Sequence, residues 1–152
     1  MENDERKRTI DNQNIDWLLQ DLVDMANTFG IYFSITLTIK GFLISGILIS
    51  GRRYFEYFAE TFSSAVPKEY PEISETIKKK FLDIAEVYPN FTEESLEVLK
   101  EEDKPENIRF FHLKDAKILF PGQSWIPSKE GIYWRGRLDS VDGFKLGTIS
   151  TE

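Results

Sequence analysis

The sequence predicts an α+β fold, with about five antiparallel strands in a curled sheet or small barrel, an N-terminal helix, and a helical insertion between strands two and three. Apolar residues recur every three or four positions before residue 30, which is helical spacing. They alternate from 31 to 49 and again after 108, which is strand spacing. An open or closed barrel of five strands is the preferred arrangement, and a curved sheet with helices on one face is the alternative.

The length of 152 residues favours one domain, 1–152, in which the polar residues 1–13 are flexible and 66–107 form an acidic helical insertion. The first helix follows in residues 15–29. Asn12 or Asn14 can cap its start, and Gly30 can end it. One stripe of this helix is apolar and suits packing on a sheet: Ile15, Leu18, Leu19, Leu22, Met25 and Phe29.

Residues 31–49 predict a hairpin with a two-residue turn at Lys40-Gly41. Gly46, in the middle of the second strand, predicts a bend or a close backbone approach. Ile47 and Ile49 lie on the face opposite the core and need a cover, either the N-terminal helix or another chain. The turn sets the pairs Ile39–Phe42, Leu37–Ile44, Ile35–Gly46 and Phe33–Leu48, all on one face.

The segment after this hairpin predicts two helices. The first carries the aromatic stripe Tyr54, Phe55, Phe58 and Phe62. The second starts at Pro71 and ends before Pro89, positions that suit proline. Between 66 and 107 there are six lysines and twelve Asp or Glu residues, a difference of −6 that accounts for most of the net charge of −7. Residues 91–107 predict either a short helix or a loose acidic connector.

Residues 108–120 predict a strand whose apolar parity switches at Lys114-Asp115, which indicates a bulge or bend. The last segment, 131–150, predicts a second hairpin. A three-residue loop, 141–143, places Ser140 opposite Phe144 and Gly143 in the left-handed region. It gathers the apolar residues on one face, Trp134, Leu138, Phe144 and Leu146. A two-residue turn at 142–143 would mix both faces, so the three-residue loop is preferred.

The register set by the three-residue loop places several cationic side chains on the face opposite the core, where they form a candidate interaction face. Arg135, Arg137 and Lys145 lie on it with Tyr133, and Arg52 and Arg53 extend it if their helix starts nearby. Such a face suits a phosphate, a carboxylate, or an acidic segment of another copy. The alternative is an ordinary solvated surface with weak ion pairs.

Gly136 lies between Arg135 and Arg137. A glycine inside a strand predicts that the sheet curls at this residue or that a neighbouring group packs closely against its backbone. His112 is the only histidine, and its place within a strand predicts a structural role. No nucleophile motif, phosphate loop or dinucleotide fingerprint occurs, and cysteine is absent. We therefore expect no enzyme activity, no catalytic residue, no cofactor and no metal.

The acidic composition, with a pI of about 4.9, disfavours general binding to nucleic acid and to anionic membranes. The longest apolar run, Gly41–Gly51, is too short to cross a bilayer as a helix. The charged start, MENDERKRTI, shows no secretory signal, so a cytoplasmic location is expected.

Three blocks of the sequence resemble the gas vesicle accessory protein U (GvpU) family. They are "FSITLTIKGFLISGILISGRRYFEYFAETF" (33–62), "FFHLKDAKILF" (110–120) and "PSKEGIYWRGRLDSVDGFKLGTIS" (127–150). They occur in the family's order and cover just under half of the chain. The resemblance implies a non-enzymatic role without cofactors, in which the protein associates with gas vesicles and controls their organisation, in particular their clustering.

The partners that the resemblance implies are the gas vesicle shell or other gas vesicle proteins, with self-association as a further contact. Neither nucleic acid nor a membrane is expected as a partner. The alternative function is a small β-barrel module that binds a ligand or nucleic acid, because small barrels commonly bind oligonucleotides on an open face.

Overall fold

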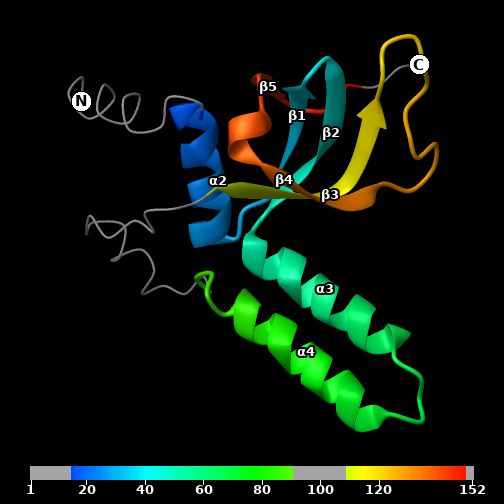
Figure 1. The fold of residues 1–152 in the computed structure, drawn as a ribbon. Coiled ribbons are helices and arrows are strands. Elements are labelled where there is room, and N and C mark those ends of the chain that lie inside the picture. The colour runs from blue at the N-terminus through cyan, green and yellow to red at the C-terminus, as the bar shows by residue number, and fades with distance from the viewer. Residues whose placement is uncertain (1–14, 91–108, 150–152) are drawn as a thin grey trace, which may run out of the picture.

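The computed structural model describes residues 15–90 and 109–149 of the chain. Five antiparallel strands form one open sheet in the order β4-β3-β2-β1-β5 (Figure 1), which confirms the α+β class. The elements in chain order are α2 (Trp17–Phe29), β1 (Phe33–Ile39), β2 (Phe42–Ile49), α3 (Gly51–Ala65), α4 (Pro71–Ala85), β3 (Phe110–Leu119), β4 (Ile132–Arg137), a 3₁₀ turn (Leu138–Ser140) and β5 (Gly143–Leu146).

Helix α2 covers one face of the sheet. Its residues Leu19, Val23 and Ala26 are buried in one cluster with the inward residues of β1, β2 and β3. Gly30 ends the helix with a φ of 63°, as predicted. The predicted caps Asn12 and Asn14 are wrong, because the Asp16 carboxylate accepts from the Leu18 N–H at 2.9 Å and takes the cap position.

The hairpin of β1 and β2 has the predicted register, from Phe33 opposite Leu48 to Ile39 opposite Phe42. Lys40 and Gly41 form the turn with φ values of 47° and 88°, the left-handed conformation that a tight hairpin turn needs. The core face is therefore the one that the alternation predicted.

The predicted break in β3 is also confirmed. The register shifts between Leu113 and Ala116, and Asp115 has a φ of 50°, a strained value for a residue that is not glycine. Gly46 of β2 faces this bulge, where a Cβ would stand 3.0 Å from the Lys114 carbonyl oxygen. Gly131 allows the loop before β4 to pack on the Asp115 backbone, which a side chain at 131 would overlap.

The predicted final hairpin is wrong. β4 pairs with β3, and β5 pairs with β1 at the other edge of the sheet. Gly143 is the first residue of β5, opposite Thr38, and is not among the glycines with positive φ, so neither turn at 141–143 forms. The turn residues Asp142-Gly143 suggested this hairpin. Pairing of β5 with β1 instead satisfies the backbone groups along the edge of β1, which a hairpin of β4 and β5 would leave unpaired.

The face assignment within this segment is mostly correct despite the wrong pairing. Leu138 is fully buried, and Trp134 and Phe144 pack against the core cluster. Leu146 was expected on the same face but is 59% exposed, because β5 ends there at the sheet edge. Gly136 lies against the Phe111 ring, which a Cβ would overlap, so the predicted close packing is confirmed.

The sheet is curled but not closed. A flat sheet of this order would separate its edge strands by about 19 Å, four spacings of about 4.8 Å. Only residues 138–142 join β4 to β5, and three of them form a compact 3₁₀ turn. The strands must therefore curl so that their edges approach. Because β4 and β5 do not pair, the open form of the predicted curled sheet is the one observed.

Helices α3 and α4 form the predicted hairpin and run side by side away from the sheet (Figure 1). Pro71 occupies the first turn of α4, as predicted. Ile49 is fully buried opposite His112, and the rings of Tyr54 and Phe55 from α3 contact that histidine. The cover expected from the N-terminal helix or another chain is therefore supplied by α3. The remaining part of the insertion, 91–107, lies outside the described residues.

No helix in the ranges 15–90 and 109–149 has the length and apolarity needed to span a membrane.

Candidate contact face

The predicted interaction residues divide into groups that lie apart. Tyr133, Arg135 and Arg137 alternate along the edge strand β4, on the face opposite α2. Lys145 lies on β5 at the other edge, opposite Thr36, with β3, β2 and β1 between. Because the predicted hairpin does not form, Lys145 is separated from the three β4 residues.

The start of α3 places Arg52 and Arg53 beside the sheet. The Ser50 hydroxyl accepts from the Arg53 N–H at 3.1 Å and caps the helix, and the Gly51 N–H donates to the Asn27 side chain at 2.8 Å. A side chain at residue 51 would overlap the Tyr88 ring, so glycine is needed. Sequence reasoning predicted the helix start but not this anchoring.

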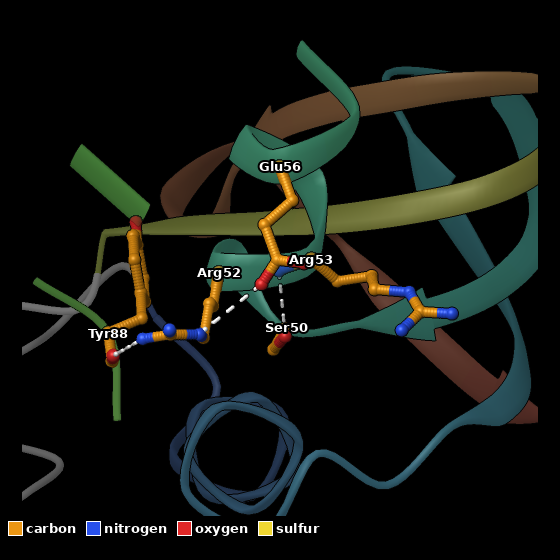
Figure 2. Close-up of polar contacts among 5 residues, drawn as sticks. All are labelled: Ser50, Arg52, Arg53, Glu56 and Tyr88. Carbon is orange, nitrogen blue, oxygen red and sulfur yellow. Dashed lines mark hydrogen bonds and ion pairs between the residues drawn. The ribbon is translucent and has the colours of Figure 1, made fainter. Parts of the chain in front are cut away.

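The two arginines of α3 point in different directions (Figure 2). Arg52 runs toward Tyr88, where its NH1 donates to the carbonyl oxygen at 3.4 Å and its Nε lies 3.3 Å from Glu56. Arg53 extends the opposite way, and its guanidinium lies 5.6 Å from the centre of the Tyr32 ring. Of this pair, therefore, only Arg53 lacks a carboxylate partner among the described residues.

Arg135 is held by a histidine and two rings. Its NH1 lies 2.7 Å from Nε2 of His112, and its guanidinium lies 4.0 Å from the Phe110 ring centre and 5.3 Å from that of Phe55. Arginine only donates, so Nε2 accepts and the imidazole proton sits on Nδ1. These contacts fix the orientation of a side chain that is otherwise exposed.

His112 has a structural place, consistent with the prediction. It is 1% exposed, and its ring centre lies 4.7 Å from that of Tyr54. Burial, and secondarily the positive charge of Arg135, lowers the pKa of His112 to about 3. The imidazole is thus neutral at neutral pH, which is the state that can accept from Arg135.

A group of tyrosines completes the surface. Tyr57 of α3 stacks on Tyr133 of β4, with ring centres 3.5 Å apart and planes 7° from parallel. The ring of Tyr32 lies 4.9 Å from the Lys114 ammonium, in addition to its contact with Arg53. Burial raises the pKa of Tyr133, as does its neighbour Tyr57, while Arg53 opposes the shift. Arg53 therefore lies near both Tyr32 and Tyr133 and connects the contacts of Tyr32 with the stack of Tyr57 on Tyr133.

Arg137 is bound at the end of β4. Its NH2 donates to Asp139 at 2.6 Å, and this hydrogen bond lowers the pKa of the Asp139 carboxyl. The Arg137 side chain is 66% exposed, so this ion pair contributes little to stability. Arg137 consequently presents less free positive charge than Arg135.

We call the surface formed by β4, β3 and the start of α3 the cation–aromatic face, made of Tyr32, Arg53, Tyr57, Lys114, Tyr133 and Arg135. Among the described residues, no ion pair joins Arg53, Lys114 or Arg135 to a carboxylate. Sequence reasoning missed Tyr32, Tyr57 and Lys114. Helical and strand parity describes each element alone and does not show which faces of different elements meet.

The fold and this surface define the class of protein: a small α+β protein with an open curled sheet, a projecting helical hairpin and a cation–aromatic face. The chain belongs to the GvpU-like family, since the family model described as "Gas vesicle protein GvpU-like" matches residues 16–149. Neither the curated proteins nor the solved structures contain a significant match.

The family match confirms the resemblance of the three strand blocks and extends beyond them. It takes in α2 and the α3–α4 hairpin as well as the strands. The chain is therefore a gas vesicle-related protein of a family that is generally non-enzymatic.

Proposed function

We propose that this protein controls the organisation of gas vesicles, in particular their clustering, through protein–protein contacts at the cation–aromatic face and without catalysis. The observation that carries the proposal is the set of three cations, Arg53, Lys114 and Arg135, that rest on aromatic rings without an ion-pair partner in the described residues. Such groups bind a carboxylate with little loss of side-chain freedom, because the rings already orient them.

The partner of this face is acidic: another copy of the chain, or the shell or another protein of the gas vesicle. Another copy is a candidate because residues 66–107 carry most of the net charge of −7. Clustering requires at least two contacts per copy, so one face on a vesicle protein and one on a second copy would suffice. The protein would act in the cytoplasm, on the outer surface of the vesicles.

Co-sedimentation with purified gas vesicles tests the proposal, together with sedimentation of the free protein at low salt. The double variants Arg135→Glu/Arg137→Glu and Arg53→Glu/Lys114→Glu should lose both vesicle binding and self-association. Lys145→Glu, a single charge reversal on β5 at the other edge strand, is the positional control and should bind as the unaltered protein does.

The second pair is informative because it leaves the contact between Arg135 and His112 in place, so loss of binding cannot be attributed to a disturbed core. Sedimentation of both double variants that matches the unaltered protein would refute the proposed contact face. Loss of binding in Lys145→Glu to the same extent would show that the contact is not confined to the cation–aromatic face.

A second candidate function is binding of single-stranded nucleic acid, favoured by the stack of Tyr57 on Tyr133 next to Arg53. Bases stack on exposed aromatic rings, and neighbouring cations attract the phosphates. The net charge of −7 opposes this function. A salt-dependent anisotropy change with labelled oligothymidine that disappears in Tyr57→Ala would support it, and no change up to high protein concentration would reject it.

A further inference from the structure

Within residues 15–90 and 109–149, the backbone of β4 is paired with another strand on one side only. The Leu138 N–H donates to the Arg109 carbonyl oxygen at 2.8 Å, so the backbone groups of residue 138 point toward β3. Backbone direction alternates along a strand, and the register places Gly136 opposite Phe111 and Trp134 opposite Leu113 in the same orientation. The N–H and C=O groups of Tyr133, Arg135 and Arg137 therefore point away from β3.

That outer side of β4 has no neighbouring strand in the part of the chain that the structure describes, because β4 is the last strand in the order. A row of unpaired backbone donors and acceptors is a template for another strand. The six residues Ile132–Arg137 are long enough to pair with a short peptide.

The side chains along this edge differ between the two faces. Tyr133, Arg135 and Arg137 stand on the face of α3, where they present two guanidinium groups and an aromatic ring. On the face of α2, Ile132 is 42% exposed and Trp134 is half-buried beside the core. An added strand would thus meet cations on one face and apolar side chains on the other.

We infer that the free edge of β4 binds an extended peptide of a partner protein as a sixth strand, with acidic residues alternating with apolar residues. The inference rests on the proposed contact face and gives its partner a chemistry and a conformation. Acidic side chains opposite Arg135 and Arg137 would lie directly across the ladder from the guanidinium groups. The apolar side chains between them would cover Ile132.

A second copy of the same edge is a poor partner. Pairing two β4 strands in antiparallel order about Arg135 would set this arginine against Arg135 or Arg137 of the other copy, and like charges directly opposite one another are destabilising. Charged edge strands commonly resist self-pairing in this way. The β4 edge therefore disfavours pairing with β4 of a second copy and favours pairing with an acidic strand of another protein.

The orientation of Arg135 supports this selection. His112 occupies NH1, while the Phe110 and Phe55 rings hold the guanidinium plane. The remaining donors of the fork can bind a carboxylate from the added strand. Because the arginine is already positioned, binding needs little further ordering of its side chain.

The inference is tested with fluorescein-labelled synthetic peptides and the full chain, by fluorescence anisotropy and by amide hydrogen exchange. The probe alternates glutamate and valine. One control holds the same residues as a block of glutamates followed by a block of valines, and another alternates lysine and valine. We expect the alternating acidic probe to bind at least tenfold more tightly than either control, with slowed exchange of the Tyr133 and Arg135 amides.

A pair of variants separates backbone pairing from charge. Arg137→Ala removes the guanidinium and keeps the edge N–H, whereas Arg137→Pro removes both. Proline is tolerated here because this N–H is not used by β3 and the φ of −93° is within about 30° of the value proline adopts. The proline variant should bind the probe at least fivefold more weakly than the alanine variant at unchanged melting temperature.

Equal affinity for the alternating and block peptides, or for the alanine and proline variants, would overturn strand addition. Absence of binding by all three peptides would overturn it as well. If the peptides bind as expected while vesicle co-sedimentation of the unaltered protein fails, the proposed vesicle function is wrong and the peptide site remains. If the unaltered protein co-sediments with vesicles but none of the peptides binds, strand addition at β4 is wrong and the proposed vesicle function remains.

Discussion

Lowering the pH should destabilise this protein through one residue, His112. Its pKa in the folded protein is about 3, below the value of 6.5 in an unfolded chain, because the ring is buried and Arg135 adds positive charge. A depressed folded pKa gives a stability that is fully present above pH 6.5 and is lost progressively as the pH falls toward the folded value. The unfolded chain binds the proton in this window, and the folded protein does not.

The magnitude follows from the difference in protonation. Between about pH 7.5 and about pH 5.5 the unfolded histidine goes from roughly one-tenth to roughly nine-tenths protonated, while the buried ring stays neutral. The free energy of unfolding should therefore fall by about 1.4 kcal/mol over this range. His112 is the single histidine of the chain, and carboxylates titrate mainly below this range, so the loss can be assigned to it.

Urea unfolding followed by circular dichroism at several pH values measures this loss. His112→Gln is the matched control, because its amide oxygen can accept from Arg135 but has no proton to gain in this range. The variant should be less stable overall, with a free energy of unfolding that stays flat between the two pH values. A flat profile in the unaltered protein, or an equal slope in the variant, would refute the reasoning.

Two further substitutions test the packing. Gly136→Ala should destabilise the protein by about 1–3 kcal/mol, because its Cβ would overlap the Phe111 ring; a melting temperature at or above that of the unaltered protein would contradict this packing. Leu138→Ala should lose about 2–5 kcal/mol in urea unfolding, since the side chain is fully buried in the core cluster. Val87→Ala, at an 82% exposed position, is the control and should change stability by less than about 0.5 kcal/mol.

Local patterns predicted those elements whose neighbours follow directly in the sequence. The hairpin of β1 and β2 has the predicted turn and register because a two-residue turn leaves only one pairing that buries one whole face. The bulge in β3 was predicted for a similar reason, since apolar parity must switch where a residue is inserted. Helix α3 followed from its aromatic stripe.

The failures concern contacts between segments far apart in the chain. The turn residues 142–143 suggested a hairpin of β4 and β5, but the open edge of β1 competes for β5 and wins. For the same reason Lys145 was placed beside Arg135 and Arg137, from which three strands separate it. Propensities describe a segment by itself and do not rank its distant partners.

The sequence predicted the β4 residues of the candidate contact face but not the side chains that surround them. Alternation along β4 showed that Tyr133, Arg135 and Arg137 share a side, because successive residues of a strand point to opposite faces. The neighbours that orient them could not be found in the same way. His112 reaches Arg135 through the pairing of β3 with β4, and Phe55 and Tyr57 reach the face because α3 packs against these strands.

The sequence by itself determined the helices, the strands and the first hairpin, because periodicity and short turns act within a few residues of one another. It also indicated the family, through three blocks of residues that resemble it. Only the tertiary structure decided the strand order, the open edge of β4 and the aromatic support of Arg135. These features depend on which distant surfaces bury each other, and that choice is made by the free energy of the whole packed chain.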